Sequence, residues 1–191
     1  MYVRSVLLLV NLFLFSMLVF GQEQRSLTQA EQIVLDTPEV IKLEFAPLNQ
    51  RGRGDVLEKM SGPFESGSTI IFNLMATNTS SIELWVRWWD RYAQNRPRLF
   101  RDNQELAYRE DIADLIKMRD SKDWEPFSVR RMKFNPNEPR VLQPFILADW
   151  YGPLGPGRYE LFTQHRFMQG GKWVNSTAIV FEVEEIKKPK Q

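Results

Sequence analysis

Short segments of alternating apolar and polar residues, separated by turn-forming residues, constrain the fold of this chain more than any other feature. Residues 157–168 and 173–184 both alternate in this way, as half-buried strands do. Between them stands Gln169-Gly170-Gly171, and paired glycines supply the positive φ angles that a tight hairpin turn requires. The two segments therefore predict an antiparallel hairpin near the C-terminus.

Similar segments begin at residue 41, where apolar residues alternate with Lys42 and Glu44 until Pro47. Further strands are predicted at residues 68–77, 82–89, 97–100, 127–134 and 141–150. Asn78-Thr79-Ser80-Ser81 predicts a hairpin between the first two of these, because Asn and Ser side chains bond to their own backbone in turns. Pro144 lacks an amide donor, which predicts that the last segment is an edge strand or a bulged one.

One segment departs from this alternation. In residues 110–118, Ile112, Leu115 and Ile116 follow a spacing of three and four, which predicts a short helix with one apolar face against the sheet. Seven or eight strands, without βαβ spacing or internal repeats, indicate an all-β protein. We expect an antiparallel two-sheet sandwich with a short helical insertion.

The C-terminal quarter of the chain carries a resemblance to a known family. Residues 154–161, Leu-Gly-Pro-Gly-Arg-Tyr-Glu-Leu, resemble the Leu-x-Pro-Gly-x-Tyr turn before the penultimate strand of immunoglobulin-like modules in exported proteins. The resemblance implies an immunoglobulin-like sandwich and a corner formed by Tyr159. There the hydroxyl bonds to backbone upstream while the ring enters the core. The chain departs from antibody-type domains because it has no cysteines.

The N-terminal residues have the layout of a secretory signal peptide. Arg4 precedes an apolar run over residues 6–20, and a cleavage site is predicted after Gly21. The run is short for a spanning helix, which needs about 20 apolar residues, although an uncleaved membrane anchor is the alternative. The predicted organisation is a signal peptide at 1–21, a loose polar leader at 22–39, a β-sandwich domain at 40–185 and a basic tail at 186–191.

Composition excludes several classes of function. The chain has 25 basic and 24 acidic residues, and loss of Arg4 with the signal peptide would balance them, so nothing favours nucleic acid. One histidine and no cysteines exclude disulfides and leave the usual zinc, iron–sulfur and Cys-His catalytic sites without ligands. No metal or cofactor is predicted. An exported domain without disulfides suggests a bacterial protein of the periplasm or exterior.

Aromatic and basic residues cluster between residues 85 and 101. Alternation along 82–89 puts Trp88 in the core, and it puts Trp85 and Trp89 on the opposite face, where two rings could form a platform for a sugar or a peptide. Burial of these rings beneath the 110–118 helix is the alternative. The predicted binding residues are Trp85, Arg87, Trp89, Tyr92, Arg98 and Arg101.

The arginines of this segment permit two interpretations. Guanidinium groups bind carboxylates or phosphates with two hydrogen bonds, so an acidic partner would fit. Asp90 and Asp102 stand close by, however, and local pairing on the surface is the alternative.

These observations favour an exported, non-enzymatic domain that binds another protein or assembles in the cell envelope. Partners would be a protein or a cell-surface glycan, with membrane contact only if residues 1–21 are retained. A carbohydrate-binding module is the alternative, and an enzyme is a third hypothesis. No catalytic residue is predicted, because His165 falls on an inner strand position and no Gly-x-Ser-x-Gly elbow occurs. Arg53-Gly54-Asp55 is interpreted as loop sequence rather than as an integrin-recognition site.

Overall fold

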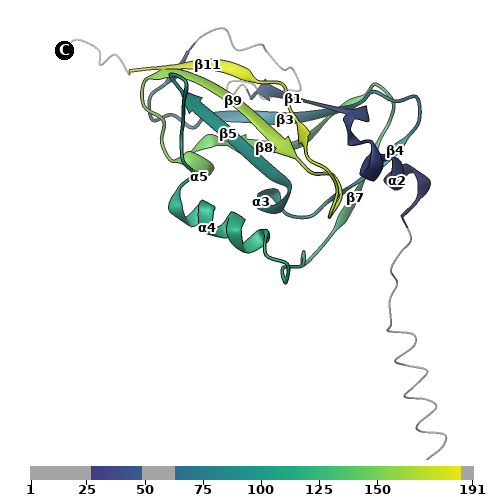
Figure 1. Cartoon of the computed structure of the whole chain (residues 1–191). Coiled ribbons are helices and arrows are strands. Elements are labelled where there is room, and N and C mark those ends of the chain that lie inside the picture. The colour runs from purple at the N-terminus through teal and green to yellow at the C-terminus, as the bar shows by residue number, and fades with distance from the viewer. Residues whose placement is uncertain (1–26, 49–62, 186–191) are drawn as a thin grey trace, which may run out of the picture.

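The computed structural model describes residues 27–48 and 63–185 (Figure 1). The predicted signal peptide, the Arg53-Gly54-Asp55 sequence and the basic tail lie outside the described residues.

The described chain is mainly β-structure, with several antiparallel sheets. The strands are β1 (Ile41–Pro47), β2 (Phe64–Glu65), β3 (Ile71–Asn78), β4 (Leu84–Trp88), β5 (Asn95–Arg101), β6 (Gln104–Glu105), β7 (Arg130–Phe134), β8 (Pro139–Ile146), β9 (Gly157–His165), β10 (Val174–Asn175) and β11 (Ile179–Glu184). The helices are α2 (Gln29–Asp36), the 3-10 turn η1 (Pro38–Val40), α3 (Arg91–Gln94), α4 (Glu110–Arg119) and α5 (Leu147–Tyr151).

Three sheets organise these strands. Sheet A has the order β1-β3-β8, sheet B has the order β2-β11-β9-β5-β6 with β10 beside β9, and sheet C pairs β4 with β7. In Figure 1, β5, β9 and β11 lie in front of β1, β3 and β8. Phe72 of sheet A and Phe181 of sheet B meet with ring centroids 5.1 Å apart, so the main core lies between these two sheets.

The predicted alternation determines which side chains enter this core. Ile41, Leu43 and Phe45 are buried on β1, as are Phe72 and Leu74 on β3. Burial of each such side chain contributes roughly 1.5–3 kcal/mol to folding. The prediction of inward-facing apolar residues on both segments is confirmed.

Tyr159 forms the contacts that the turn sequence implied. Its ring is 1% exposed and stacks on Phe181 with a centroid separation of 5.3 Å. Its hydroxyl donates to the carbonyl oxygen of Gly155, at 2.7 Å. One residue therefore ties the turn before β9 to the apolar core.

The predicted helix and the prediction that Pro144 lies in an edge or bulged strand agree with the structure. Helix α4 extends over Glu110–Arg119 and buries Ile112 and Ile116. Strand β8 is an edge strand of sheet A, and its register with β3 also shifts beside Leu74, as a bulge does. The predicted strand ends at Ile146, however, because the next residues form α5.

The C-terminal hairpin is confirmed, but the predicted hairpin at residues 78–81 is wrong. Strand β3 pairs with β1 and β8, while β4 pairs with β7. Asn78 is fully buried, and its amide nitrogen donates to the carbonyl oxygens of Ile82 at 2.7 Å and Phe134 at 3.0 Å. These bonds turn the chain out of sheet A and into sheet C.

The prediction of a short edge strand at residues 97–100 also needs correction. Strand β5 is longer, and seven of its residues pair with β9. The two-residue strand β6 lies on its other side. Asp102 and Asn103 form the turn between β5 and β6, with φ angles of 49° and 66°.

The described part of the predicted leader is folded rather than loose. Thr28 and Glu31 form a capping box at the start of α2, which satisfies amide groups that a helix start leaves unpaired. Val34 of this helix is 1% exposed and belongs to the core. The folded domain therefore begins before residue 40.

Candidate functional site

The end of β4 decides where the predicted binding residues lie. The strand stops at Trp88, and Asp90 caps α3 by accepting the amides of Tyr92 at 2.8 Å and Ala93 at 3.0 Å. Alternation therefore ends before Trp89, whose side chain is 6% exposed. The predicted platform of two exposed rings, Trp85 and Trp89, does not form.

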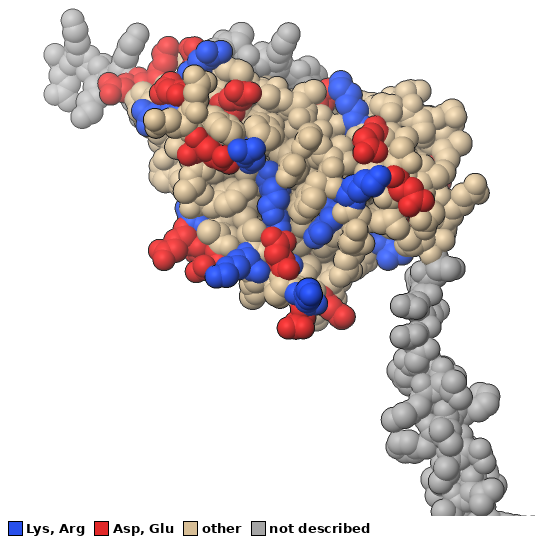
Figure 2. All heavy atoms as spheres, viewed as in Figure 1, with Lys and Arg blue, Asp and Glu red and all other residues tan. Residues whose placement is uncertain are grey.

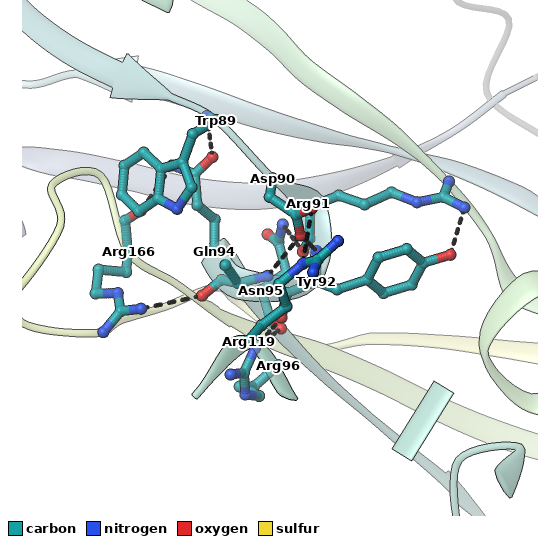
Figure 3. A network of polar contacts seen from close by, with 10 residues as sticks. Trp89, Asp90, Arg91, Tyr92, Gln94, Asn95, Arg96, Arg119 and Arg166 are labelled. Carbon is teal, nitrogen blue, oxygen red and sulfur yellow. Dashed lines mark hydrogen bonds and ion pairs between the residues drawn. The ribbon is translucent and has the colours of Figure 1, made fainter. Parts of the chain in front are cut away.

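Buried amide groups around α3 hold Trp89 in place (Figure 3). Gln94 is fully buried, and its side-chain oxygen accepts the backbone amide of Trp89 at 2.8 Å. Its side-chain nitrogen donates to the carbonyl oxygens of Arg87 and Arg166, both at 2.9 Å. Because each polar atom of this side chain has a partner, Gln94 joins β4 to the chain after β9 at little desolvation cost.

Arginines extend the network outward. Arg119 at the end of α4 pairs with Asp90 at 3.1 Å, and Arg96 of β5 pairs with Asp120 at 2.5 Å. Arg166 donates to the carbonyl oxygen of Ala93 at 3.2 Å. These arginines therefore connect α3, α4 and sheet B. The pairing is not the local one expected within residues 85–101, because Arg96 pairs with an aspartate 24 positions away.

A cleft of about 240 Å³ lies beside this network. Its lining residues are Trp89, Asp90, Arg119, Trp124, Glu125, Pro126, Phe127 and Ser128. The guanidinium of Arg119 lies 4.9 Å from the centroid of the Trp124 ring. Phe127 is fully exposed, whereas Trp89 is buried. The indole N–H of Trp89 has no hydrogen-bond partner among the described residues.

Trp85 and Arg87 lie elsewhere, on the side of sheet C that α2 contacts. Trp85 is half-buried beneath the guanidinium of Arg131, which is 5.0 Å from the ring centroid. Arg87 pairs with the buried carboxylate of Glu31 on α2, at 3.1 Å. Arg87 and Arg131, the arginine above Trp85, therefore hold the N-terminal helix in place.

The remaining predicted residues are also separated from the cleft. The ring of Tyr92 packs against that of Trp150 in a tilted arrangement, with centroids 4.9 Å apart. Arg98 makes two hydrogen bonds to Glu105, at 2.7 and 2.6 Å, on the outer face of sheet B. Arg101 donates to the carbonyl oxygen of Pro156 at 2.6 Å. Of the six predicted binding residues, only Trp89 lines the cleft.

The sequence interpretation missed Trp124 and Phe127. They frame Glu125-Pro126 in a segment that the structure leaves without helix or strand. The predicted strand at 127–134 included Phe127, but β7 begins only at Arg130, so Phe127 lies outside the sheet. Two aromatic residues on either side of a proline were the available signal.

The single histidine of the sequence lies in the core of the domain. His165 is buried and its Nδ1 lies 2.7 Å from the Asn95 side-chain oxygen. Burial, with a smaller effect of Arg166, lowers the pKa of His165 to about 3. Within residues 27–48 and 63–185, no group of three His, Asp or Glu residues could hold a metal ion. No helix in these ranges is long and apolar enough to cross a membrane.

The sequence matches no protein-family model and no curated protein.

Proposed function

We propose that this chain is an exported, non-enzymatic domain with an immunoglobulin-like sandwich, and that it binds another protein through the cleft beside Trp89. Support for the sandwich comes from the packing of sheet A on sheet B and from the Tyr159 corner. Support for export comes from the signal-like pattern of residues 1–21.

The size and lining of the cleft carry this proposal. Pockets for small molecules usually measure about 300–1,000 Å³, whereas this cleft holds about 240 Å³. It therefore suits one side chain of a protein better than a complete substrate or cofactor. Trp89, Trp124 and Pro126 offer apolar walls, so an aliphatic or proline side chain is the favoured occupant.

Phe127 adds a contact at the rim of the cleft. Its complete exposure means that the ring has no packing role in the isolated domain. Aromatic residues dominate the binding energy of many protein interfaces. A partner that covered Phe127 while inserting a side chain beside Trp124 would bury apolar surface from both.

The unpaired indole N–H of Trp89 indicates how a peptide would be oriented. A buried donor without a partner costs roughly 1–3 kcal/mol. A backbone carbonyl of the bound segment would remove this cost if residues 124–128 moved outward to admit it. Of the charged residues at the cleft, Asp90 and Arg119 already pair with each other, whereas Glu125 also lines the cleft, so a bound segment would meet both apolar and charged groups.

Site-specific photo-crosslinking tests the proposal. A photoreactive amino acid replaces Phe127 in the full chain, and in a matched chain it replaces Val141, which is 50% exposed on β8. We expect a discrete protein adduct from position 127 that is absent from position 141. With that protein purified, Phe127→Ala should weaken the dissociation constant by about 30-fold, as loss of an interface hot spot does, and Val141→Ala should leave it unchanged. Equal adducts from both positions, or equal affinities, would contradict the assigned surface.

A further inference from the structure

A second hollow lies on the outer face of sheet B, separate from the Trp89 cleft. It measures about 240 Å³ and lies at the end of β5. Besides the core residue Tyr159, the lining residues are Phe100, Asp102, Asn103, Arg158, Glu160 and Val180. We call it the sheet B groove. In Figure 2, charged side chains of both signs border uncharged surface on the face of the molecule where sheet B lies in Figure 1.

Strand register builds the groove. Glu160 on β9 pairs with Phe100 on β5 and with Val180 on β11, so these three residues form one row across the sheet. The turn after β5 adds Asp102 and Asn103 at one end of this row. Both turn residues have positive φ angles, which fix their side chains at the end of a tight hairpin.

The apolar part of the groove is a supported ring. Phe100 stacks on Phe162 at an interplanar angle of 14° and a centroid distance of 5.8 Å. The Arg98 guanidinium lies 5.1 Å from the Phe100 centroid. Val180 is 51% exposed next to this row. Because its neighbours already hold the Phe100 ring in place, the ring can pack against the apolar face of a ligand without a further loss of side-chain entropy.

The polar part of the groove has uncommitted donors and acceptors. The side chains of Asn103, Arg158 and Glu160 make no hydrogen bond or ion pair with any residue in the described part of the chain. Amide and guanidinium nitrogens donate, while amide and carboxylate oxygens accept. Hydroxyl groups can satisfy both kinds, because each donates once and accepts twice.

We infer that the sheet B groove binds one neutral pyranose unit of an oligosaccharide. A pyranose combines an apolar C–H face, suited to Phe100, with hydroxyl groups, suited to the uncommitted polar side chains. Neutrality follows from the charges: Asp102 already pairs with Arg101 at 3.7 Å, and Glu160 and Arg158 carry opposite charges, so the groove has no net positive charge with which to attract an acidic sugar. This inference does not depend on the proposed protein-binding cleft.

Isothermal titration calorimetry on the full chain tests the inference with named probes. Cellohexaose, chitohexaose and mannohexaose are the neutral probes, and hexagalacturonate is the acidic one. We expect at least one neutral hexamer to bind with a dissociation constant in the millimolar range or tighter, and we expect the acidic hexamer not to bind. Absence of binding by all three neutral hexamers at millimolar concentration would overturn the inference, as would stronger binding of hexagalacturonate.

Three variants locate the binding. Phe100→Ala should weaken it at least tenfold. Asn103→Gly removes the side-chain amide while keeping the positive φ angle, and it should also weaken sugar binding. Because this variant is a surface change in a turn, it tests the groove even if Phe100→Ala disturbs folding. Phe127→Ala, in the separate cleft, should bind the sugar as the unmodified chain does. Unchanged affinity in both groove variants would refute the groove as the site. A loss with Phe127→Ala alone would place sugar binding in the cleft instead and would also overturn the inference.

Discussion

The single histidine of this chain makes one pH effect unusually easy to isolate. His165 is buried against Phe167 and Asn95, and burial lowers its pKa to about 3. Its usual pKa, near 6.5, is restored when the chain unfolds. Between these values the unfolded chain binds a proton at this position and the folded chain does not. Acidification below about pH 6.5 therefore favours unfolding, and this loss of stability continues until the folded pKa is reached.

The magnitude follows from proton linkage. The free energy of unfolding changes by at most about 1.36 kcal/mol per pH unit for each proton taken up on unfolding. Because the pKa of His165 in the folded chain lies far below 5, lowering the pH from 7.5 to 5 should cost about 2 kcal/mol of stability through His165 alone. Carboxylates titrate mostly below this range.

Urea unfolding at several pH values, followed by tryptophan fluorescence, measures this slope. His165→Gln keeps an amide that can donate to Asn95 but does not titrate. We expect the unmodified chain to lose about 2 kcal/mol between pH 7.5 and 5 and the variant to lose little. A difference in absolute stability at pH 7.5 would not affect the comparison of slopes. A flat profile for the unmodified chain, or equal slopes for both chains, would refute the assignment of a buried neutral imidazole.

Two further predictions concern stability. Burial alone would raise the pKa of Glu31, but hydrogen bonds from Thr28 and Arg87 outweigh it and hold this pKa below its ordinary value. The stabilisation by the Glu31 carboxylate is therefore present at neutral pH and is lost as the pH falls through that lowered pKa. Glu31→Gln should cost about 2 kcal/mol of stability at pH 7, between the values for buried and exposed ion pairs, and should lower Tm by about 6 °C. The exposed pair of Glu44 with Lys42 provides the control, since Glu44→Gln should change stability by under about 0.5 kcal/mol. Equal effects of the two variants would contradict this explanation. Tyr159→Phe should cost about 1 kcal/mol in urea unfolding through loss of the bond to Gly155, whereas an unchanged midpoint would show that this corner does not stabilise the domain.

Local patterns predicted the elements whose burial is one-sided. The alternation of Ile41, Leu43 and Phe45 and the helical spacing of Ile112 and Ile116 both reflect one apolar face against the core. The pairing of the strands was harder to predict from the sequence. Residues 78–81 have an ordinary turn sequence, but the side-chain amide of Asn78 donates to the carbonyl oxygens of Ile82 and Phe134. The second of these bonds joins residues far apart in the sequence.

The candidate site was predicted only in part, for two physical reasons. The capping sequence of Thr28 and Glu31 could be recognised, but Glu31 is buried only because Arg87 and Arg131 come to it from distant strands. Asp90 likewise ends the alternation by capping α3, so Trp89 is buried rather than exposed as the alternation predicted. In both cases polar contacts outweigh what the hydrophobic pattern predicts.

The arginines indicate how a domain without cysteines could fix the proposed binding surface. Arg119 joins α4 to Asp90 of the α3 cap, and Arg96 joins β5 to Asp120 beyond α4. Each pair is partly exposed and contributes at most about 1 kcal/mol, so their effect on total stability is small. Their effect on geometry is larger, because both pairs hold the C-terminal end of α4, which leads to Trp124 and Phe127, against α3 and β5. Substitution of these arginines should therefore alter partner affinity through the shape of the cleft, whereas substitution of Phe127 removes a direct contact.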